Sequence, residues 1–255
     1  RVSDLHTQIS YIRNCERYAD LIITAPALSQ LLVRPYLRGR HVLPDKMIEF
    51  NPRQRKRKPK IVFAPTNPTY KGEKYVMKAV NKIRDEGIEF ELILLNKEPY
   101  ESCLSIYSDA DILIGELFYP GGGKQQREAL AAGCVVLTNN DPKYETHLPG
   151  NIPFIHADKK NIYQKLMKAI IDFDLRSSLC IEGKSYTDKE NSPEKACSEI
   201  MEAMCKKVDL IKPTFYSDKL VMTNAELETV KPWDESVQNC KWFIENDLSI
   251  KYRVK

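Results

Sequence analysis

Short apolar runs alternate with amphipathic stretches through the middle of the chain. The apolar runs predict buried strands over residues 60–64, 90–95, 111–114, 134–138 and 152–155. Apolar positions at helical spacing predict helices over residues 71–86, 99–108 and 124–132. Strands that alternate with helices form right-handed βαβ units. We therefore predict an α/β fold, a Rossmann-like parallel sheet with helices on both faces.

The flanking segments predict part of a second α/β domain and a helical end. Before the sheet, helices are expected over residues 1–18 and 26–33, and short strands over 19–24 and 39–43. After it, residues 161–207 are predicted helical, with Ser192 as an N-cap and Pro193 in the first turn. The predicted domains are 1–55 (the C-terminal part of one α/β domain), 56–207 (a Rossmann-like domain) and 208–255 (a tail with one helix at about 236–245).

The net charge of +4 is local rather than global. The stretch RQRKRKPK, residues 53–60, holds six of the 39 basic residues. Without it 33 basic residues stand against 35 acidic ones, a net charge of −2. A duplex-binding face needs a broader basic surface, so we interpret this stretch as a solvated linker. A nucleic-acid site is not favoured, and a peripheral membrane contact is the intermediate alternative.

Cysteine and histidine usage argues against disulfides and metal sites. The seven cysteines include no C-x-x-C pair, and the four histidines are dispersed. This pattern is typical of reduced thiols in a cytoplasmic protein and predicts no metal site. No apolar run approaches the length that a membrane span requires. We expect a cytoplasmic location, with peripheral membrane contact as the alternative.

The glycine-rich segment after the strand at 111–114 is the first candidate site. Gly121, Gly122 and Gly123 precede a predicted helix, and backbone without side chains can approach a phosphate or a sugar closely. A flexible loop is the alternative reading. Lys124 at the helix start opposes the helix dipole, which makes sense if an anion lies there.

Polar residues also follow two predicted strands. Thr66 and Asn67 come after the strand at 60–64, and Glu116 comes after the strand at 111–114. Ligands bind at the carboxyl ends of strands in open α/β sheets. Thr66 and Asn67 could donate hydrogen bonds to phosphate. Glu116 is either a ligand of a bound substrate or a plain loop carboxylate.

Four stretches together resemble the retaining glycosyltransferases of family 4, which have the GT-B fold. They are KIVFAPTNPTYKGEKYVMKAV with its Lys71-Gly72 pair, YSDADILIGEL, REALAAGCVVLTN with Glu128, and the helical run from residue 158 to about 205. Residues 1–52 resemble the end of that family's acceptor domain. The resemblance covers roughly residues 18–207 and implies a GT-B donor-binding domain.

The resemblance implies transfer of a hexose from a nucleotide-sugar donor with retention of anomeric configuration. It implies that Lys71 contacts the donor diphosphate and that the Glu128 carboxylate accepts hydrogen bonds from the ribose hydroxyls. It also implies chemistry without a metal or another cofactor, and a C-terminal tail that packs back on the first domain. The acceptor stays open among glycans, lipids and small molecules.

Two positions depart from the family pattern. The family has an acidic residue eight positions before Glu128, where this chain has Pro120, and an Arg five positions before Lys71, where it has Thr66. These departures favour a first alternative, a degenerate GT-B-like protein that binds a nucleotide or a partner without turnover. A second alternative, prompted by the basic stretch, is a sugar transferase that modifies nucleic acid.

Overall fold

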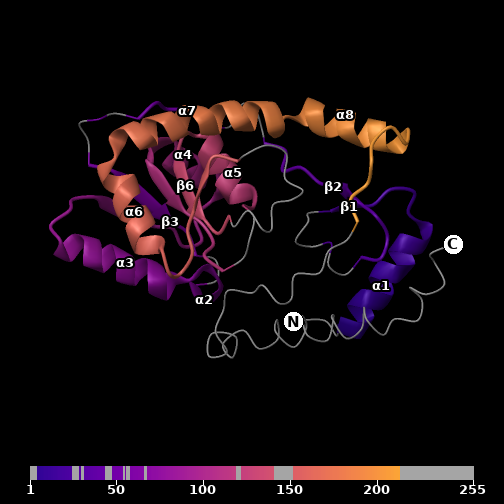
Figure 1. Cartoon of the computed structure of the whole chain (residues 1–255), viewed down its shortest axis with the longest axis horizontal. Coiled ribbons are helices and arrows are strands. Elements are labelled where there is room, and N and C mark those ends of the chain that lie inside the picture. The colour runs from indigo at the N-terminus through magenta and orange to yellow at the C-terminus, as the bar shows by residue number, and fades with distance from the viewer. Residues whose placement is uncertain are drawn as a thin grey trace. The chain divides into compact units, whose positions relative to one another are not determined.

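The chain divides into two compact units (Figure 1). One comprises Arg1–Arg40 with Cys197–Lys255, and the other comprises His41–Ala196. The computed structural model describes residues 5–24, 29, 32–43, 48–53, 55, 58–65, 68–118, 122–140 and 152–212. The domain limits at 55/56 and 207/208 stay predictions.

The larger unit is built on one parallel five-stranded sheet. Its strands are β3 (Lys60–Phe63), β4 (Glu91–Leu94), β5 (Ile112–Ile114), β6 (Val135–Thr138) and β7 (Phe154–His156). Their order in the sheet is β4-β3-β5-β6-β7, and all neighbours are parallel. Each strand lies within or one residue from its predicted range, so the predicted α/β fold with a parallel sheet is confirmed.

The side chains of the central strands alternate between two cores. One core contains Val76, Val80 and Leu166 from the helices, and the strand residues that face it are Ile61, Phe63, Ile112, Ile114, Val135 and Leu137. Their neighbours in sequence, including Val62, Leu113 and Val136, face a second core with Leu104 and Leu130. Because successive side chains point to opposite faces, a strand that is apolar at every position must be covered twice.

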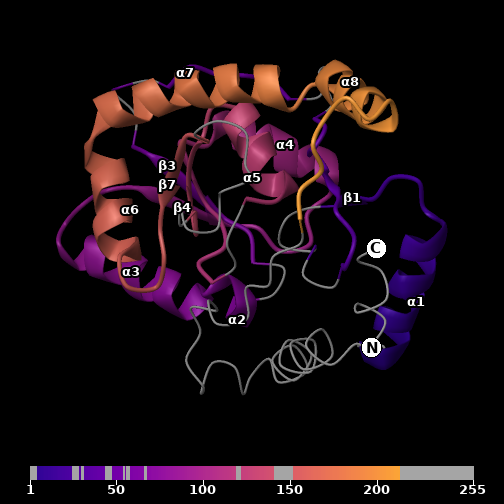
Figure 2. The same ribbon diagram turned by 45° about the vertical axis from the view of Figure 1, so that its right-hand side comes forward.

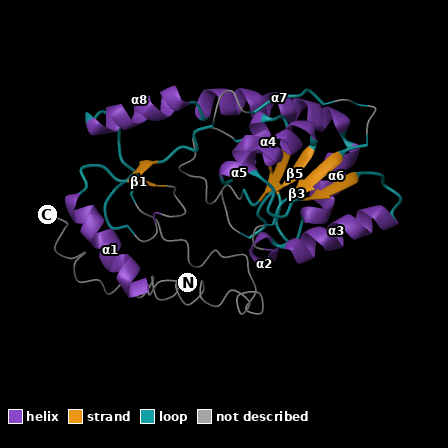
Figure 3. Cartoon of the chain, turned by 180° about the vertical axis from the view of Figure 1, so that it is seen from behind, coloured by secondary structure: helices purple, strands orange, loops and turns teal. Residues whose placement is uncertain are grey.

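Helices cover both faces of the sheet (Figure 3). Helix α3 (Glu73–Asp85) packs against α6 (Ile162–Ile171) on one face (Figure 2). Helices α4 (Tyr100–Asp109), α5 (Lys124–Ala131) and α7 (Phe173–Glu190) lie together on the other. Among the described residues, every helix is too short or too polar to span a bilayer.

The helix predicted over residues 71–86 is divided in the structure. A four-residue helix, α2 (Pro68–Lys71), ends at Gly72, and α3 begins one residue later. Gly72 has φ of 79°, a left-handed conformation in which residues with a side chain are strained. The chain therefore changes direction immediately after Lys71, which separates this lysine from the face of α3.

The smaller unit contains α1 (Leu5–Tyr18) and the parallel pair β1 (Ile23–Thr24) and β2 (Leu37–Arg38). The strand predicted over residues 39–43 is wrong. The amide of Gly39 still bonds to Thr24, but the amide of Leu43 bonds instead to the carbonyl of Asn191, away from any strand. Most of the helix predicted at 26–33, and the helix at 236–245, lie outside the described residues.

The helical region after the sheet ends with α8 (Pro193–Met204). Its predicted cap is confirmed, because the Ser192 hydroxyl accepts a hydrogen bond of 3.2 Å from the backbone amide of Lys195. Residues 213–255, which include both tryptophans, lie outside the described residues. The predicted packing of the tail therefore stays a prediction.

Arg53 contradicts the interpretation of the basic stretch as a solvated linker. Its side chain is buried, and the guanidinium donates hydrogen bonds to the carbonyl oxygens of Gly133, Ser108 and Ala132 at 2.9 to 3.0 Å. These carbonyls lie at the C-terminal ends of α4 and α5, where helical carbonyls lack partners within the helix. One buried cation thus joins two helix ends.

Three further basic side chains of the stretch also pair within the larger unit. Arg55 binds Asp174 and lies 4.9 Å from the Phe173 ring centroid. Lys58 lies 3.0 Å from Glu89, and Lys60 binds Asp109. Lys56 and Arg57 lie outside the described residues. The described basic side chains of this stretch are therefore paired with acidic side chains of the protein or, for Arg53, with backbone carbonyls.

Candidate functional site

The order of the strands places a topological switch point between β3 and β5. These two strands are neighbours, but the chain leaves β3 towards β4 and leaves β5 towards β6 on the other side. The crevice at the carboxyl end of such a pair is the usual ligand site of open α/β sheets. The segment after β3 carries Lys71, and the segment after β5 carries Glu116 and the glycines.

Lys71 is buried, with only 7% of its surface exposed. Its ammonium donates a hydrogen bond of 2.8 Å to Oε1 of Gln125, the second residue of α5. At Gly72, the next residue, an added Cβ would lie in tight contact with the Leu117 side chain, at 3.2 Å. Lys71 is therefore not the solvated surface lysine that its residue type alone suggests.

Lys71 and Glu116 influence each other electrostatically. Burial lowers the pKa of the Lys71 ammonium, and the Glu116 carboxylate opposes part of that shift. Burial raises the pKa of Glu116, and Lys71 opposes part of that shift in turn. The segments that follow β3 and β5 thus bring a partly desolvated cation near a partly desolvated carboxylate, an environment that strengthens interactions with a charged ligand.

The glycine segment is closely packed where the structure describes it. Gly122 is buried, and an added Cβ would lie 2.4 Å from the Phe154 ring. Gly123 is the N-cap of α5 and has no side chain to accept from the first-turn amides. Those backbone N–H groups and the helix dipole favour an anion at this end of α5.

Glu128 lies one turn further along α5, with 5% of its surface exposed. Its Oε1 accepts a hydrogen bond of 2.7 Å from the hydroxyl of Tyr100 and lies 3.5 Å from Nζ of Lys124. The Lys124 ammonium also lies 4.7 Å from the Tyr100 ring centroid. Glu128 is therefore an oriented carboxylate rather than a solvated helix glutamate.

Gln125 connects the two halves of the candidate site. It bonds to Lys71 and lies three residues before Glu128, so Gln125 and Glu128 share one face of α5. Predicted residues from after β3 and after β5 are thus brought together at one helix. The predicted residues Thr66, Asn67 and Gly121 lie outside the described residues, as does Pro120.

The sequence analysis missed Gln125, Tyr100 and Tyr107. Gln125 follows the glycine segment directly, and Tyr100 begins the helix after β4, so their places at the carboxyl edge were a usable signal. Tyr107 gave none, because an aromatic residue at helical spacing is typical of core packing. Its hydroxyl accepts a hydrogen bond of 3.0 Å from Nε2 of Gln125.

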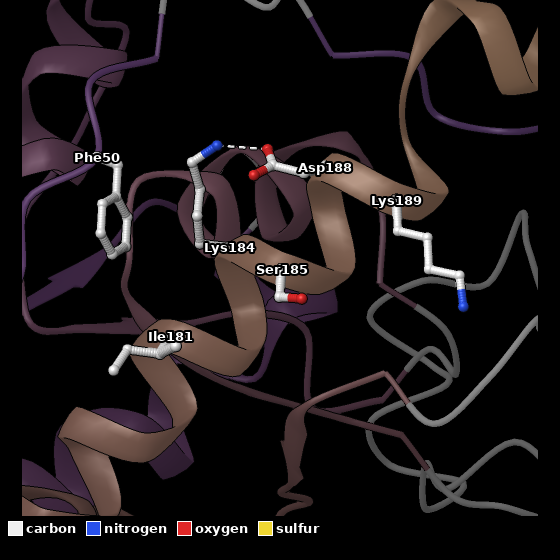
Figure 4. A pocket seen from close by; sticks show the side chains of 6 residues that line it. All are labelled: Phe50, Ile181, Lys184, Ser185, Asp188 and Lys189. Carbon is white, nitrogen blue, oxygen red and sulfur yellow. Dashed lines mark hydrogen bonds and ion pairs between the residues drawn. The ribbon is translucent and has the colours of Figure 1, made fainter.

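The described residues include no group of three His, Cys, Asp or Glu side chains placed to hold a metal ion. A separate hollow of about 550 Å³ lies along α7 and is lined by Phe50, Ile181, Lys184, Ser185, Asp188 and Lys189 (Figure 4). Lys184 is paired with Asp188, and Lys189 lies 3.9 Å from Glu190. None of the predicted site residues lines this hollow.

No protein-family model matches the sequence, and no curated protein matches it. Solved structures do match the fold. HepE of Anabaena, in complex with UDP and glucose, has a TM-score of 0.60 at 12% identity over 80% of this chain and 68% of its own. Sucrose-phosphate synthase of Thermosynechococcus elongatus has a TM-score of 0.59 at 12% identity over 79% of this chain and 61% of its own.

A third similar structure is TarM of S. aureus, a mutant in complex with Fondaparinux, alpha-GlcNAc-glycerol and UDP. Its TM-score is 0.54 at 12% identity, over 78% of this chain and 46% of its own. The fold is that of the GT-B glycosyltransferases. This chain spans roughly half to two thirds of the length of these neighbours.

Proposed function

We propose that this chain is the donor-binding part of a glycosyltransferase that moves a sugar from a nucleotide-sugar donor to an acceptor. The observation that carries the proposal is the buried Lys71 ammonium at the switch point, bonded to the helix that bears the buried carboxylate Glu128. A cation bonded to the first turn of α5 and a carboxylate further along that helix suit a diphosphate followed by a ribose. The fold neighbours solved with UDP or UDP-glucose support the same ligand class.

In the proposed reaction the leaving group is the nucleoside diphosphate. Negative charge grows on the diphosphate as the bond to the sugar breaks. Lys71 and the first amides of α5, after Gly123, stabilise that charge. Lys71 and these amides are held in place before the substrate binds. Little free energy is therefore needed to orient them during the reaction. In this scheme Lys71 and these amides stabilise the leaving diphosphate without a divalent cation. The proposed transfer is therefore metal-independent.

Glu128 holds the ribose in this proposal. A carboxylate accepts hydrogen bonds from two vicinal hydroxyls, and the Tyr100 hydroxyl already fixes the orientation of this one. Glu116, beside Lys71, is assigned to the hydroxyls of the donor sugar. Thr66, Asn67, Gly121, Gly122 and Lys124 complete the proposed donor site. The proposed stereochemical outcome is retention, and the proposed donor sugar is a hexose.

A binding protein without turnover is the second candidate, favoured by Pro120 and Thr66 at positions where family 4 has an acidic residue and an Arg. Isothermal titration calorimetry with UDP, ADP and GDP, joined to a donor-hydrolysis assay with the corresponding glucose nucleotides, separates the two. Binding with hydrolysis supports the transferase. Binding without hydrolysis supports the second candidate as a nucleotide-binding protein, and absence of binding contradicts the transferase.

The matched variants are Lys71→Met and Lys74→Met. Lys74 is an exposed lysine on α3. Loss of a charge-assisted hydrogen bond costs about 1.5–3 kcal/mol, so Lys71→Met should weaken nucleoside diphosphate binding roughly tenfold or more. Lys74→Met should bind like the unaltered protein. The same titrations in EDTA should give unchanged affinities, and a requirement for a divalent cation would contradict the metal-independent scheme.

A further inference from the structure

The side-chain amide of Gln125 is bonded at both of its ends. Its Oε1 accepts a hydrogen bond of 2.8 Å from the Lys71 ammonium, and its Nε2 donates one of 3.0 Å to the Tyr107 hydroxyl. The three residues come from α2, α5 and α4, and span 54 positions from Lys71 to Gln125. One amide thus ties the segment after β3 to the helices on one face of the sheet.

Tyr107 is the fixed end of this chain of bonds. Its side chain is buried in the core that contains Leu104, Ala129 and Leu130. Burial raises the pKa of the Tyr107 hydroxyl, which therefore stays neutral and does not place a negative charge beside the site. Because the phenol oxygen accepts from Nε2, the amide must turn its oxygen, an acceptor, towards Lys71.

A lysine side chain has about 2 kcal/mol of rotamer entropy and a mobile ammonium group. The amide oxygen of Gln125 restricts the Lys71 ammonium by a hydrogen bond. Because the amide is neutral, it does not cancel the positive charge of Lys71. A carboxylate at the same position would form an ion pair with Lys71 and compete with an anionic ligand. Because Tyr107 holds the Nε2 of Gln125, the Oε1 of Gln125 can fix the position of the Lys71 ammonium. The positive charge of Lys71 stays available to an anionic ligand.

We propose that Gln125, anchored by Tyr107, is a positioning residue that holds the Lys71 ammonium where it meets the diphosphate of the donor. This inference rests on the proposed function, since it assigns Lys71 to the diphosphate. Gln125 acts through Lys71 and needs no contact with the nucleotide. Lys71, Gln125 and Glu128 then form one ordered row, in which the helix sets the spacing between the diphosphate and ribose groups.

A double-mutant cycle tests this role. The variants are Gln125→Met, Lys71→Met and the double variant, titrated with UDP, ADP, GDP and inorganic pyrophosphate. Gln125→Met should weaken binding of the nucleoside diphosphate and of pyrophosphate by about tenfold in the unaltered background. In the Lys71→Met background the same change should have almost no further effect, because coupled residues are not additive. Equal losses in both backgrounds would overturn the proposal.

Two more variants separate position from charge. Gln125→Glu keeps an acceptor for Lys71 but adds a carboxylate, and should weaken pyrophosphate binding more than Gln125→Met does. Tyr107→Phe removes the anchor but not the amide, and should weaken binding about threefold, a smaller loss than the truncation of Gln125. The controls are Gln164→Met and Gln164→Glu, at an exposed position of α6. A Gln125→Glu variant that binds pyrophosphate more tightly would contradict the proposal.

A second readout needs no nucleotide. Lysine amines are labelled by ¹³C-methylation, the Lys71 signal is assigned from its absence in Lys71→Met, and its pKa is measured by NMR. Gln125→Met should lower the pKa of the Lys71 amine and Gln125→Glu should raise it, because the charged form loses or gains a partner. Unchanged values would refute the positioning of Lys71 by Gln125. Shifted values in a protein that binds no nucleoside diphosphate would refute only the proposed function.

Discussion

The Tyr100 hydroxyl donates a hydrogen bond of 2.7 Å to Oε1 of Glu128, joining the first residue of α4 to the second turn of α5. The bond orients a carboxylate that is almost entirely buried. A buried carboxylate loses water and gains strength as an acceptor, so its remaining oxygen capacity is well placed for hydroxyl donors.

The first prediction concerns Glu128→Gln. If the carboxylate holds the ribose hydroxyls, this variant should bind nucleoside diphosphates roughly tenfold more weakly, because hydrogen bonds to charged groups contribute about 1.5–3 kcal/mol. It should also lose the preference for the ribonucleotide over the 2′-deoxyribonucleotide, and bind pyrophosphate unchanged. Calorimetry with the three ligands measures this. Glu101→Gln, at an exposed position of α4, is the control. If Glu128→Gln keeps the preference for the ribonucleotide, Glu128 does not bind the ribose hydroxyls.

The second prediction concerns pH and Lys71. Burial lowers the pKa of this ammonium, so it loses its proton at a lower pH than an ordinary lysine. Nucleoside diphosphate affinity should therefore fall as the pH rises through that value. Lys71→Arg should abolish the fall, because arginine stays charged. Lys74→Arg should leave it in place. Titrations across the alkaline range test this, and a fall that persists in Lys71→Arg would contradict it.

The third prediction concerns the partner carboxylate. Glu116 raises the pKa of Lys71 and so keeps it protonated to a higher pH. Glu116→Gln removes that charge, and the alkaline fall in affinity should move to lower pH. At neutral pH Lys71 is still charged, and the variant should bind pyrophosphate at least as tightly as the unaltered protein, because a carboxylate that competes with the anion is removed. A shift to higher pH would mean that the two groups do not interact in the way that their burial indicates.

The fourth prediction concerns Arg53. Arg53→Met removes three buried hydrogen bonds to carbonyl oxygens, of which the Ser108 carbonyl keeps a second donor in Asn51, and should destabilise the protein by about 3 kcal/mol or more. Arg55→Met removes an exposed ion pair with Asp174 and should cost less than about 1 kcal/mol. Urea unfolding compares the two. Similar losses would show that Arg53 does not join the ends of α4 and α5.

The fifth prediction concerns the packing of the glycine segment. Gly122→Ala should destabilise the protein by about 1–3 kcal/mol, because its Cβ would overlap the Phe154 ring. In a Phe154→Leu background the added cost should be smaller, since the atoms 2.4 and 2.5 Å away, Cε2 and Cζ, are absent. Thermal unfolding of the four proteins measures the difference. If Gly122→Ala destabilises the protein equally in both backgrounds, the added Cβ does not clash with the Phe154 ring.

The sheet was predictable because its signals are local. Runs such as KIVF and VVLT are apolar at every position, which requires burial on both faces, and the glycines at 87 and 133 end their helices. The strand expected at 39–43 failed for a non-local reason, since the amide of Leu43 finds its partner at Asn191. The break at Gly72 comes from its left-handed backbone, which the periodicity of apolar residues does not encode.

The candidate site was predictable only in part. Lys71 and Glu128 were found through order along the chain and family resemblance, and Glu116 through its place after a strand. Gln125 and Arg53 depend on partners more than 50 positions away, so a sequence pattern shows only a polar residue and a charge run. Their roles follow from burial and contacts, which arise only when separate elements meet.

The most direct measurement of the central claim is a crystal structure of this protein with a bound nucleoside diphosphate, chosen by the titrations. The account predicts the diphosphate within hydrogen-bonding distance of the Lys71 ammonium and the first amides of α5. It also predicts the ribose hydroxyls on the Glu128 carboxylate and the Lys71–Gln125 bond retained. A nucleotide bound away from the crevice between β3 and β5, or with its ribose away from Glu128, would contradict the account.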